Sequence, residues 1–353
     1  MTAAASLDRA LVVIPCLNEE RHLDPLVRTL VEEAGDALIV IADGGSTDSS
    51  RSIAGRLAAE FRNVVLLDNP RRLQAAGINL AVERFGSGRT WLVRVDAHCS
   101  YPEQFLPRLL RTGERLGVSS VVVPMNTRGE TCFQKAVAAA QNSVLGTGGS
   151  AHRISTRGQF VDHGHHALMR IDAFRSAGGY CEMMSHNEDA ELDVRLRARG
   201  AKIWLEPSLA IEYFPRATPT ALFAQYLRYG GGRAQTTRRH NIPLRARQAA
   251  PLLVAPALLL SLGSVASSWF AAPLLAWAAV CLIWGVLISL RSRSKCELMA
   301  GPAAMIMHLA WSMGFWRYLL IAAWSERDKD WRAGLRFRPN RPPPTPHSPP
   351  GRS

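Results

Sequence analysis

Short apolar runs alternate with segments of helical spacing across residues 10 to 210. The apolar runs cover residues 11–14, 38–43, 64–68, 90–96 and 119–125. Continuous apolar runs of this length are typical of strands buried on both faces, and their alternation with helices predicts a parallel sheet. We therefore expect an α/β fold, with an open, mostly parallel sheet and helices on both faces.

Polar residues follow these predicted strands and mark the expected ligand edge. They are Asn18, Glu19, Asp43 to Asp48, Asp68 and Asp96 to His98. Ligands in open α/β sheets bind beyond the carboxyl ends of the strands. The chain has no GxxxxGK[ST] motif, and its first turn, PCLNEE, lacks the glycines of a dinucleotide site. Acidic strand ends suit ribose hydroxyls, base N–H groups and a divalent cation instead.

A different hydrophobic pattern follows, because residues 251–290 contain no charged side chain. A helix needs about 20 apolar residues to span a bilayer, so this length predicts two spans, at about 251–270 and 272–290. Pro273 suits the first turn of the second helix. A buried hairpin in a soluble protein is the alternative, but soluble helices usually carry a polar face.

The segment 303–324 is also long enough to span a bilayer, but it carries His308 and Arg317. Charged side chains inside a span are costly and usually face protein or a polar cavity. A third span, an interfacial helix and a re-entrant segment all stay open for this part of the expected membrane region, about 250–325. The final residues, 326–353, are basic and rich in proline, and we expect them to be disordered.

Charge predicts the orientation of these parts. The formal net charge is +13, a balance typical of proteins that bind nucleic acid, phosphorylated ligands or anionic membranes. Arginines gather before the first predicted span and after the second, so the positive-inside rule places both flanks in the cytosol. We expect a cytosolic front domain over residues 1–245 in a multi-pass plasma-membrane protein, with no nucleic acid partner. The first ten residues do not resemble a secretory signal.

The cysteines are scattered along the chain. They are Cys16, Cys99, Cys132, Cys181, Cys281 and Cys296. No two of them have the spacing of a metal site, so we expect free thiols in a reducing compartment.

The apolar run TWLVRVD ends in Asp96, and His98 follows two residues later. This pair could bind a metal, or it could belong to a capped turn before the helix expected near Pro102. The motifs PCLNEE, IADGGSTDSS, VRVDAH and NEDAELDVRLRARG, in this order, resemble those of glycosyltransferase family 2, whose members have the GT-A fold. DAH, GTGGSAHR, VDHGHHALMR and the late apolar segments are similar to a narrower, membrane-anchored group that acts in exopolysaccharide biosynthesis.

The resemblance implies a nucleotide-sugar site at the strand ends. The residues that it assigns to the donor are Asn18, Glu19, Asp43, Gly45, Ser46 and Asp96. In the family, the aspartate that matches Asp43 binds the uracil N–H, and the small residues after it let the backbone approach the base.

The resemblance also implies a metal. Asp96 and His98 would take the two ends of the family's DxD motif and hold Mn²⁺ or Mg²⁺ on the diphosphate. Imidazole is a softer ligand than carboxylate, which favours Mn²⁺.

The segment NEDAELD matches the family's catalytic motif, which makes Asp189 the general base, with Glu188 beside it. Acids also gather at helix starts because the helix dipole favours negative charge there. A solvated helix terminus is therefore the alternative for this segment.

Two further segments resemble acceptor-side motifs. QYLRYGGGR is similar to the QxxRW motif of membrane-bound members, which implies that Gln225 and Arg228, one helical turn apart, bind pyrophosphate. A basic patch against anionic lipid is the alternative. VDHGHH is similar to the acceptor loop, with Asp162 near the acceptor, and its histidines lack the further ligands of a zinc site.

These observations predict a metal-dependent, inverting hexosyltransferase anchored in a membrane. The resemblance implies UDP-glucose as the donor, a glycan on polyprenyl pyrophosphate as the acceptor, and other exopolysaccharide assembly enzymes as partners. A processive polysaccharide synthase of the same fold is one alternative. A catalytically silent membrane scaffold that binds nucleotide or lipid is another.

Overall fold

The computed structural model describes residues 7–150 and 155–324, so the tail at 326–353 lies outside the described residues. The main sheet has eight strands in the order β3-β2-β1-β4-β9-β6-β10-β8. They are β1 (Ala10–Cys16), β2 (Leu38–Asp43), β3 (Val64–Asp68), β4 (Trp91–Arg94), β6 (Ser120–Val123), β8 (Gln159–Phe160), β9 (His165–Arg170) and β10 (Ile203–Leu205).

Most of the sheet is parallel. Strand β1 pairs in parallel with both β2 and β4, β2 with β3, and β6 with β10. Strand β9 lies between β4 and β6 and is antiparallel to both, and β8 is antiparallel to β10 at the edge. The expected mostly parallel α/β sheet is confirmed, and β9 brings a second chain direction into its centre.

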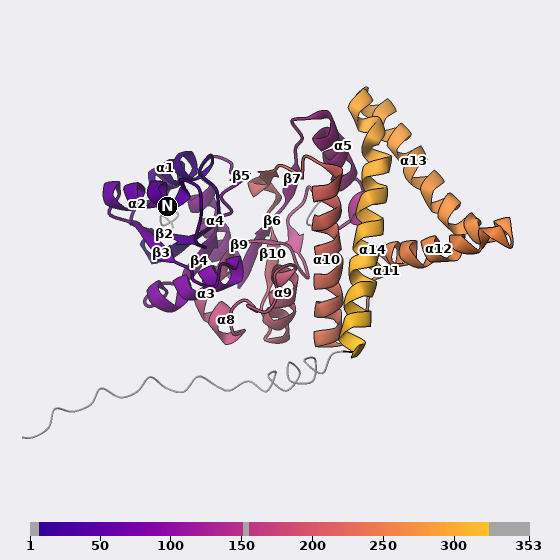
Figure 1. The fold of residues 1–353 in the computed structure, drawn as a ribbon. Helices are drawn as coiled ribbons and strands as arrows, with labels where there is room; N and C mark the ends of the chain where they lie inside the picture. Colours follow the sequence, from indigo (N-terminus) through magenta and orange to yellow (C-terminus); the bar gives the residue numbers. More distant parts are fainter. Residues whose placement is uncertain (1–6, 151–154, 325–353) are drawn as a thin grey trace, which may run out of the picture.

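Helices cover both faces of this sheet (Figure 1). On one face lie α1 (Leu23–Ala34), α2 (Ser50–Glu60) and α4 (Phe105–Leu116), packed around Val12 and Ile14. On the other face lie α3 (Gln74–Phe85), α8 (Ile171–Ser176) and α9 (Glu188–Ala198), packed around Leu11 and Val13. Side chains alternate along a strand, so β1 supplies both cores.

A smaller sheet borders the carboxyl end of β4. It consists of β5 (Cys99–Ser100), β11 (Ile211–Tyr213) and β7 (Met125–Thr127), with β11 in the middle. Helices α5 (Cys132–Gln141) and α6 (Val144–Thr147) follow β7. Strand β5 begins directly after His98, so this sheet fixes one wall of the region where the predicted site residues lie.

Two long helices, α10 (Pro219–His240) and α14 (Ala300–Trp324), lie side by side along the α/β part (Figure 1). Their backbones approach closely at two glycines. A Cβ atom on Gly230 would lie 2.0 Å from the carbonyl oxygen of Trp311, and one on Gly314 would lie 1.9 Å from that of Leu227. Any larger residue at either position would therefore separate the helices. Helix α14 also packs against α5, so one side of the segment 303–324 contacts protein.

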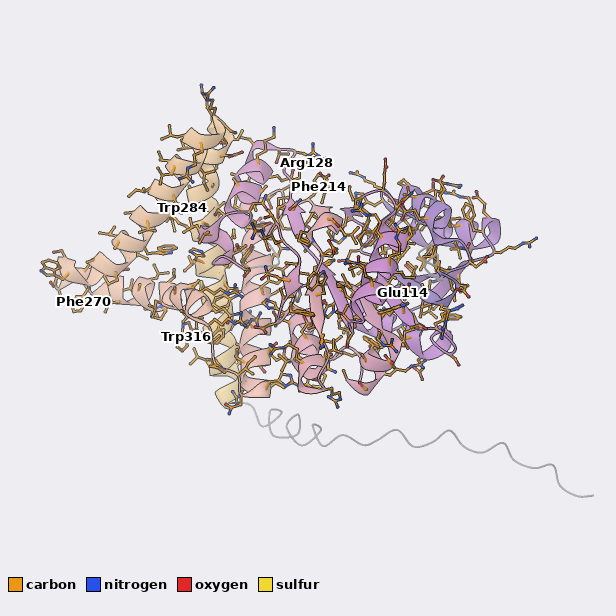
Figure 2. The ribbon with its side chains drawn as sticks, turned by 180° about the vertical axis from the view of Figure 1, so that it is seen from behind. Glu114, Arg128, Phe214, Phe270, Trp284 and Trp316 are labelled. Atoms are coloured by element: carbon orange, nitrogen blue, oxygen red, sulfur yellow. A yellow bond between two sulfur atoms is a disulfide. The ribbon has the colours of Figure 1, made fainter. Side chains whose placement is uncertain are left out.

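An apolar hairpin projects away from α10 and α14. It contains α11 (Ala246–Leu252), α12 (Val254–Ser261) and α13 (Ala272–Ser292), and Pro273 lies in the first turn of α13. Short 3-10 turns at Leu262–Val265 and Ser268–Ala271 join α12 to α13. Figure 2 shows Phe270 at the tip of this hairpin, and neighbouring Trp269 is 82% exposed. An exposed apolar tip of this kind is expected of a segment in contact with lipid.

Three helical segments of the described chain are long and apolar enough to cross a membrane. They are Ala246–Val265, Ser268–Ser292 and Lys295–Ile321. The first two are 17% and 11% buried within the protein, whereas the third is 50% buried. A larger share of the apolar stretch of the third segment is therefore buried within the protein than in either helix of the hairpin.

The expectation of free thiols throughout is wrong for one pair. Cys132, at the start of α5, forms a disulfide with Cys296, in the 3-10 turn Lys295–Met299 between α13 and α14. The two residues are 164 positions apart, and the turn folds back onto α5 to bring their Cα atoms within 5.0 Å. Sequence spacing carries no signal for this contact. Cys16, Cys99, Cys181 and Cys281 are not disulfide-bonded, as expected.

Candidate active site

The first two strand ends are tied together by side chains. Asn18 follows β1 in the left-handed conformation, with φ 58°. Its Oδ1 accepts a hydrogen bond from the Thr47 backbone N–H at 2.8 Å, and its own N–H donates to Ser46 Oγ at 3.0 Å. These bonds hold the loop after β2 against the turn after β1, so the predicted donor residues of both loops form one surface.

Asp43 orders the loop that follows it. Its Oδ1 accepts from Ser46 Oγ at 2.6 Å, and its Oδ2 accepts from the Gly45 N–H at 3.2 Å and from Arg51 Nη1 at 3.2 Å. Gly45 has φ +80°, a conformation that residues with a Cβ rarely adopt. The partners of this buried carboxylate are the loop's own groups and Arg51, and its predicted contact with uracil stays a prediction.

Asp96 and His98 follow β4 at the same edge of the sheet. Asp96 Oδ1 accepts from Gln74 Nε2 and from Arg94 Nε, each at 3.0 Å. Burial alone would raise the pKa of Asp96, but the Arg94 guanidinium holds it well below its usual range. His98 Nδ1 lies 3.0 Å from Glu19 Oε1, and this bond raises the pKa of the imidazole. The structure thus joins Glu19 to the DAH segment.

The donor types at this edge suit a divalent cation. Asp96 offers carboxylate oxygen, and His98 keeps Nε2 for a metal because Nδ1 is bonded to Glu19. Within residues 7–150 and 155–324, no group of three or more His, Cys, Asp or Glu side chains is arranged to hold a metal ion. The predicted role of Asp96 and His98 in metal binding stays a prediction.

Asp189 also lies at this edge of the sheet, next to Arg94, although it comes 93 positions after Asp96 in the sequence. It lies in the first turn of α9, which Asn187 starts with φ 65°. Arg94 Nη1 donates to Asp189 Oδ1, while Arg94 Nε and Nη2 donate to Asp96. One buried guanidinium, 5% exposed, thus joins the predicted donor carboxylate to the predicted base. Against the effect of burial, Arg94 lowers the pKa of Asp189 and keeps it ionised.

Two histidines of VDHGHH flank this pair of carboxylates. His165 Nε2 lies 3.8 Å from Asp96 Oδ2, and His165 Nδ1 lies 4.0 Å from Asp189 Oδ2. His166 Nδ1 lies 3.6 Å from Asp189 Oδ1. Strand β9, antiparallel to β4, puts both imidazoles here.

Glu188 has a different environment from its neighbour Asp189. Burial and the charge of Asp189 raise the pKa of Glu188 to about 7. A carboxylate with a pKa near neutrality is well matched to proton transfer. The predicted catalytic pair therefore contains one ionised acid and one that titrates near pH 7.

The remaining acid of the first turn of α9, Glu191, holds other parts of the fold together. Its carboxylate accepts from Arg195 Nη2 at 2.6 Å, lies 3.2 Å from Arg239 Nη1 and lies 2.9 Å from His240 Nε2. Arg239 and His240 end α10, so Glu191 fastens α10 to α9. With its side chain fully buried in these contacts, Glu191 is poorly placed to act as a base.

The predicted acceptor-side residues do not gather into one cluster. Gln225 is 7% exposed, and its amide donates to the Tyr213 hydroxyl at 2.9 Å and to the Tyr229 hydroxyl at 3.0 Å. Arg228, one turn later, is exposed. Asp162 forms ion pairs with Arg197 and Arg245 that tie its loop to α9 and to the start of α11.

Sequence reasoning missed two parts of this site. Arg94 carried one signal, a lone charged residue inside the buried run WLVRV. Gln74 carried none, because it approaches Asp96 from the start of α3, 22 positions away.

Comparisons with known proteins show the family of this chain. Residues 11–178 match the family model described as glycosyl transferase family 2. The chain is 49% identical over 313 residues to succinoglycan biosynthesis protein ExoA of Rhizobium meliloti (strain 1021), covering 88% of this chain and 95% of that protein. The chain therefore belongs to glycosyl transferase family 2 and is a glycosyltransferase.

More distant likenesses support the fold. The mannosyltransferase PcManGT from Pyrobaculum calidifontis, solved with GDP-Man and Mn²⁺, has a TM-score of 0.59 at 17% identity, covering 88% of this chain and 87% of that chain. This likeness and the family match confirm the expected GT-A fold. A Methanococcus voltae protein is 21% identical over 243 residues, 65% of this chain and 74% of its own length. Its name is dolichyl N-acetyl-alpha-D-glucosaminyl phosphate 3-beta-D-2,3-diacetamido-2,3-dideoxy-beta-D-glucuronosyltransferase.

Proposed function

We propose that this glycosyltransferase moves a hexose, with inversion, from a nucleotide sugar to a glycan on polyprenyl pyrophosphate at a membrane surface. We infer UDP-glucose as the donor and exopolysaccharide assembly of the succinoglycan type as the setting. The 49% identity to the succinoglycan protein ExoA supports the setting. The dolichyl sugar phosphate in the name of the Methanococcus relative supports a polyprenyl-linked acceptor.

The observation that carries this proposal is the shared guanidinium of Arg94. It joins Asp96, at a strand end where α/β sheets bind ligands, to Asp189, at a helix start 93 positions further along the chain. For a single displacement, a donor-binding carboxylate and a general base must both lie near the anomeric carbon. A nucleotide-binding scaffold would not need the second carboxylate.

The proposed reaction is a single displacement. Asp189, held ionised, takes the proton of the acceptor hydroxyl as the oxygen attacks the anomeric carbon. The bond from that carbon to the diphosphate breaks, and the nucleoside diphosphate leaves. When bound at Asp96 and His98, a divalent cation supplies positive charge that neutralises the leaving group. Loops ordered by Asn18 and Asp43 hold the donor in place, which lowers the entropic cost of the step.

The apolar hairpin supports the proposal of a lipid-linked acceptor. Helix α10 carries Arg228 and connects the α/β part to the hairpin, so a lipid-linked diphosphate would lie between the base and the bilayer. The exposed guanidinium of Arg228 suits bidentate contact with phosphate oxygens. We infer that the α/β part and the turn after α13 both face the cytosol. To test this orientation, single cysteines are introduced into that turn and intact cells are treated with an impermeant thiol reagent. Reaction of these cysteines would reject the orientation.

The experiment that tests the function uses membranes from cells that overproduce the protein. Membranes are incubated with a panel of labelled nucleotide sugars and Mn²⁺, and the lipid extract is analysed. We expect label from UDP-glucose to enter the lipid extract as one added hexose, and membranes carrying Asp189→Asn to give none. A long labelled polymer would favour a processive synthase. No label from any donor, with nucleotide binding intact, would favour a silent scaffold.

A further inference from the structure

Two cations from outside helix α9 approach the proposed base. Arg94, on β4, donates from Nη1 to Asp189 Oδ1, and His166, on β9, places Nδ1 3.6 Å from the same oxygen. Both lie inside motifs that carry the resemblance, VRVDAH and VDHGHHALMR, but the resemblance assigned no role to either residue. Both are buried, at 5% and 0% exposure, so their contacts with Asp189 are part of the interior.

His166 is itself held by two buried groups. Its Nε2 lies 2.7 Å from Asp193 Oδ1, and its Nδ1 lies 2.7 Å from the Tyr180 hydroxyl. Asp193 also accepts from the Gly164 N–H at 3.3 Å, which fixes the carboxylate. The Tyr180 hydroxyl in turn lies 3.4 Å from Arg94 Nη1. The groups form a closed network in which the two cations share the tyrosine.

Charge alternates through this network. Burial alone would lower the pKa of His166, but Asp193 and Asp189 raise it, so the imidazole is favoured in its charged form. Acidic and basic side chains then alternate from Asp193 through His166 and Asp189 to Arg94. Alternation of this kind makes it tolerable to bury several ionised groups together.

Building on the proposed role of Asp189 as the base, we propose that Arg94 and His166 are positioning residues. Together they hold the Asp189 carboxylate ionised and oriented toward the acceptor, and Arg94 fixes its distance from the donor carboxylate Asp96. Neither touches substrate. Arg94 cannot accept a proton at any working pH, and both ring nitrogens of His166 are engaged by Asp193 and Tyr180.

The fork of Arg94 matters as well as its charge. Nε and Nη2 contact Asp96 while Nη1 contacts Asp189, a geometry that a lysine ammonium cannot reproduce. Lysine should therefore keep part of the electrostatic effect and lose the link between the two carboxylates. A neutral side chain of similar length should lose both effects.

The test compares kcat, KM for donor and the pH profile of kcat/KM in purified full-length enzyme. The groups that face Asp189 and could contribute to that profile are Arg94 and Asp96 of the β4 segment, His165 and His166 of β9, Tyr180 after α8, and Glu188 and Asp193 of α9. His166→Gln removes one positive charge from beside Asp189, which raises the pKa of the base. The variants are compared in a His98→Asp background, so that protonation of the metal-site histidine does not set the acidic limb of the profile. In this background we expect that limb to move upward by roughly half to one pH unit.

The Arg94 variants supply the second arm. We expect Arg94→Met to lower kcat by about 100-fold or more, and Arg94→Lys to recover part of that loss, since a base that is no longer correctly positioned forfeits much of the roughly 10²–10⁴-fold that general base catalysis supplies. His240→Gln is the matched control, because this imidazole bonds Glu191 on the same helix but not Asp189. It should lower thermal stability and leave the pH profile unchanged.

The outcomes separate the inference from the function on which it rests. A wild-type enzyme without transfer would remove the proposed function, whereas an Asp189→Asn variant with normal transfer would remove only the base role of Asp189. Active wild type with an unshifted profile in folded His166→Gln, or with Arg94→Met close to wild type, overturns the positioning role alone. If His166→Gln does not fold, Tyr180→Phe, which deletes the hydroxyl bonded to His166, replaces it: a shifted acidic limb supports the role, and a profile that coincides with wild type overturns it.

Discussion

The donor-side loops and helix α9 organise polar groups in two different ways. In the loops after β1 and β2, side chains such as Asn18 and Asp43 bond backbone N–H groups and hydroxyls that lie next to them at the same sheet edge. In α9, four acids within six positions face three distant parts of the chain. Glu188 and Asp189 face the shared Arg94 region, Glu191 holds α10, and Asp193 holds His166.

Residues of the same type can therefore have different roles when their partners lie in remote parts of the chain. The loop residues bond several of their neighbours, so a loop keeps part of its order when one residue is substituted. The α9 acids are partly or fully buried among charges, where removing one partner leaves another uncompensated. We therefore expect substitutions in α9 to have larger and more specific effects than substitutions in the loops.

The largest effect is expected at Asp189. Asp189→Asn keeps the size of the side chain but cannot take the acceptor proton, and removal of a general base typically costs about 10²–10⁴-fold in rate. Donor binding should stay within a few-fold of wild type. Turnover measured with saturating donor, alongside equilibrium binding of UDP, checks both statements. Near-normal turnover would move the base role to Glu188, whose pKa is about 7.

Glu191 should affect stability rather than chemistry. The contacts of its carboxylate with His240 and Arg195 lower its pKa from 4.5 to about 2, against the effect of burial. Because the folded-state pKa is depressed, this stabilisation is fully present above pH 4.5 and is lost as pH falls toward 2. The shift corresponds to roughly 3 kcal/mol. Thermal unfolding in detergent should show Glu191→Gln less stable than wild type at pH 7, with the gap closing on acidification.

His98 should link metal and donor. His98→Ala is expected to raise the half-saturating Mn²⁺ concentration by about 10-fold or more and to weaken donor binding in parallel. His98→Asp should keep activity and shift its preference toward Mg²⁺, because carboxylate oxygen suits the harder ion. Activity should also fall as pH drops through the histidine range, since a protonated imidazole cannot ligate. A metal titration of the Ala variant that overlays wild type would make His98 a turn residue.

The smallest effect is expected in the donor loops. Asn18→Ala removes the acceptor of the Thr47 N–H, a bond near the surface that is worth about 1 kcal/mol. We expect KM for donor to rise a few-fold with kcat unchanged, because the loop loses order but no reacting group. A fall in kcat as large as that of an α9 variant would erase the distinction between the two regions.

The sequence predicted well those features that depend on neighbouring residues. Alternating apolar runs predicted the parallel sheet, and strand ends predicted where Asn18, Asp43 and Asp96 would meet. The acid-rich start of α9 was also visible. The antiparallel insertion of β9 was not, because short apolar strands carry no mark of direction, and with it His165 and His166 came to face Asp189.

Other features depended on contacts between remote segments. The Cys132–Cys296 bond forms because the turn between α13 and α14 folds back on α5. Arg94 is a charged residue inside a buried strand, and its position is explained by its two carboxylate partners, Asp96 and Asp189. Gly230 and Gly314 lie in unrelated stretches of sequence, and only the crossing of α10 and α14 explains both.

We infer that Asp96 and Asp189 belong to one transfer site that serves a lipid-linked acceptor. The most direct test uses purified enzyme in lipid nanodiscs with UDP-[¹⁴C]glucose, Mn²⁺ and lipid-linked acceptor extracted from cells that lack the enzyme, and it counts UDP released and label in the lipid phase. We predict one UDP for each hexose transferred, and neither product from Asp189→Asn. Release of UDP without labelled lipid, or equal amounts of labelled lipid from wild type and variant, would contradict this account.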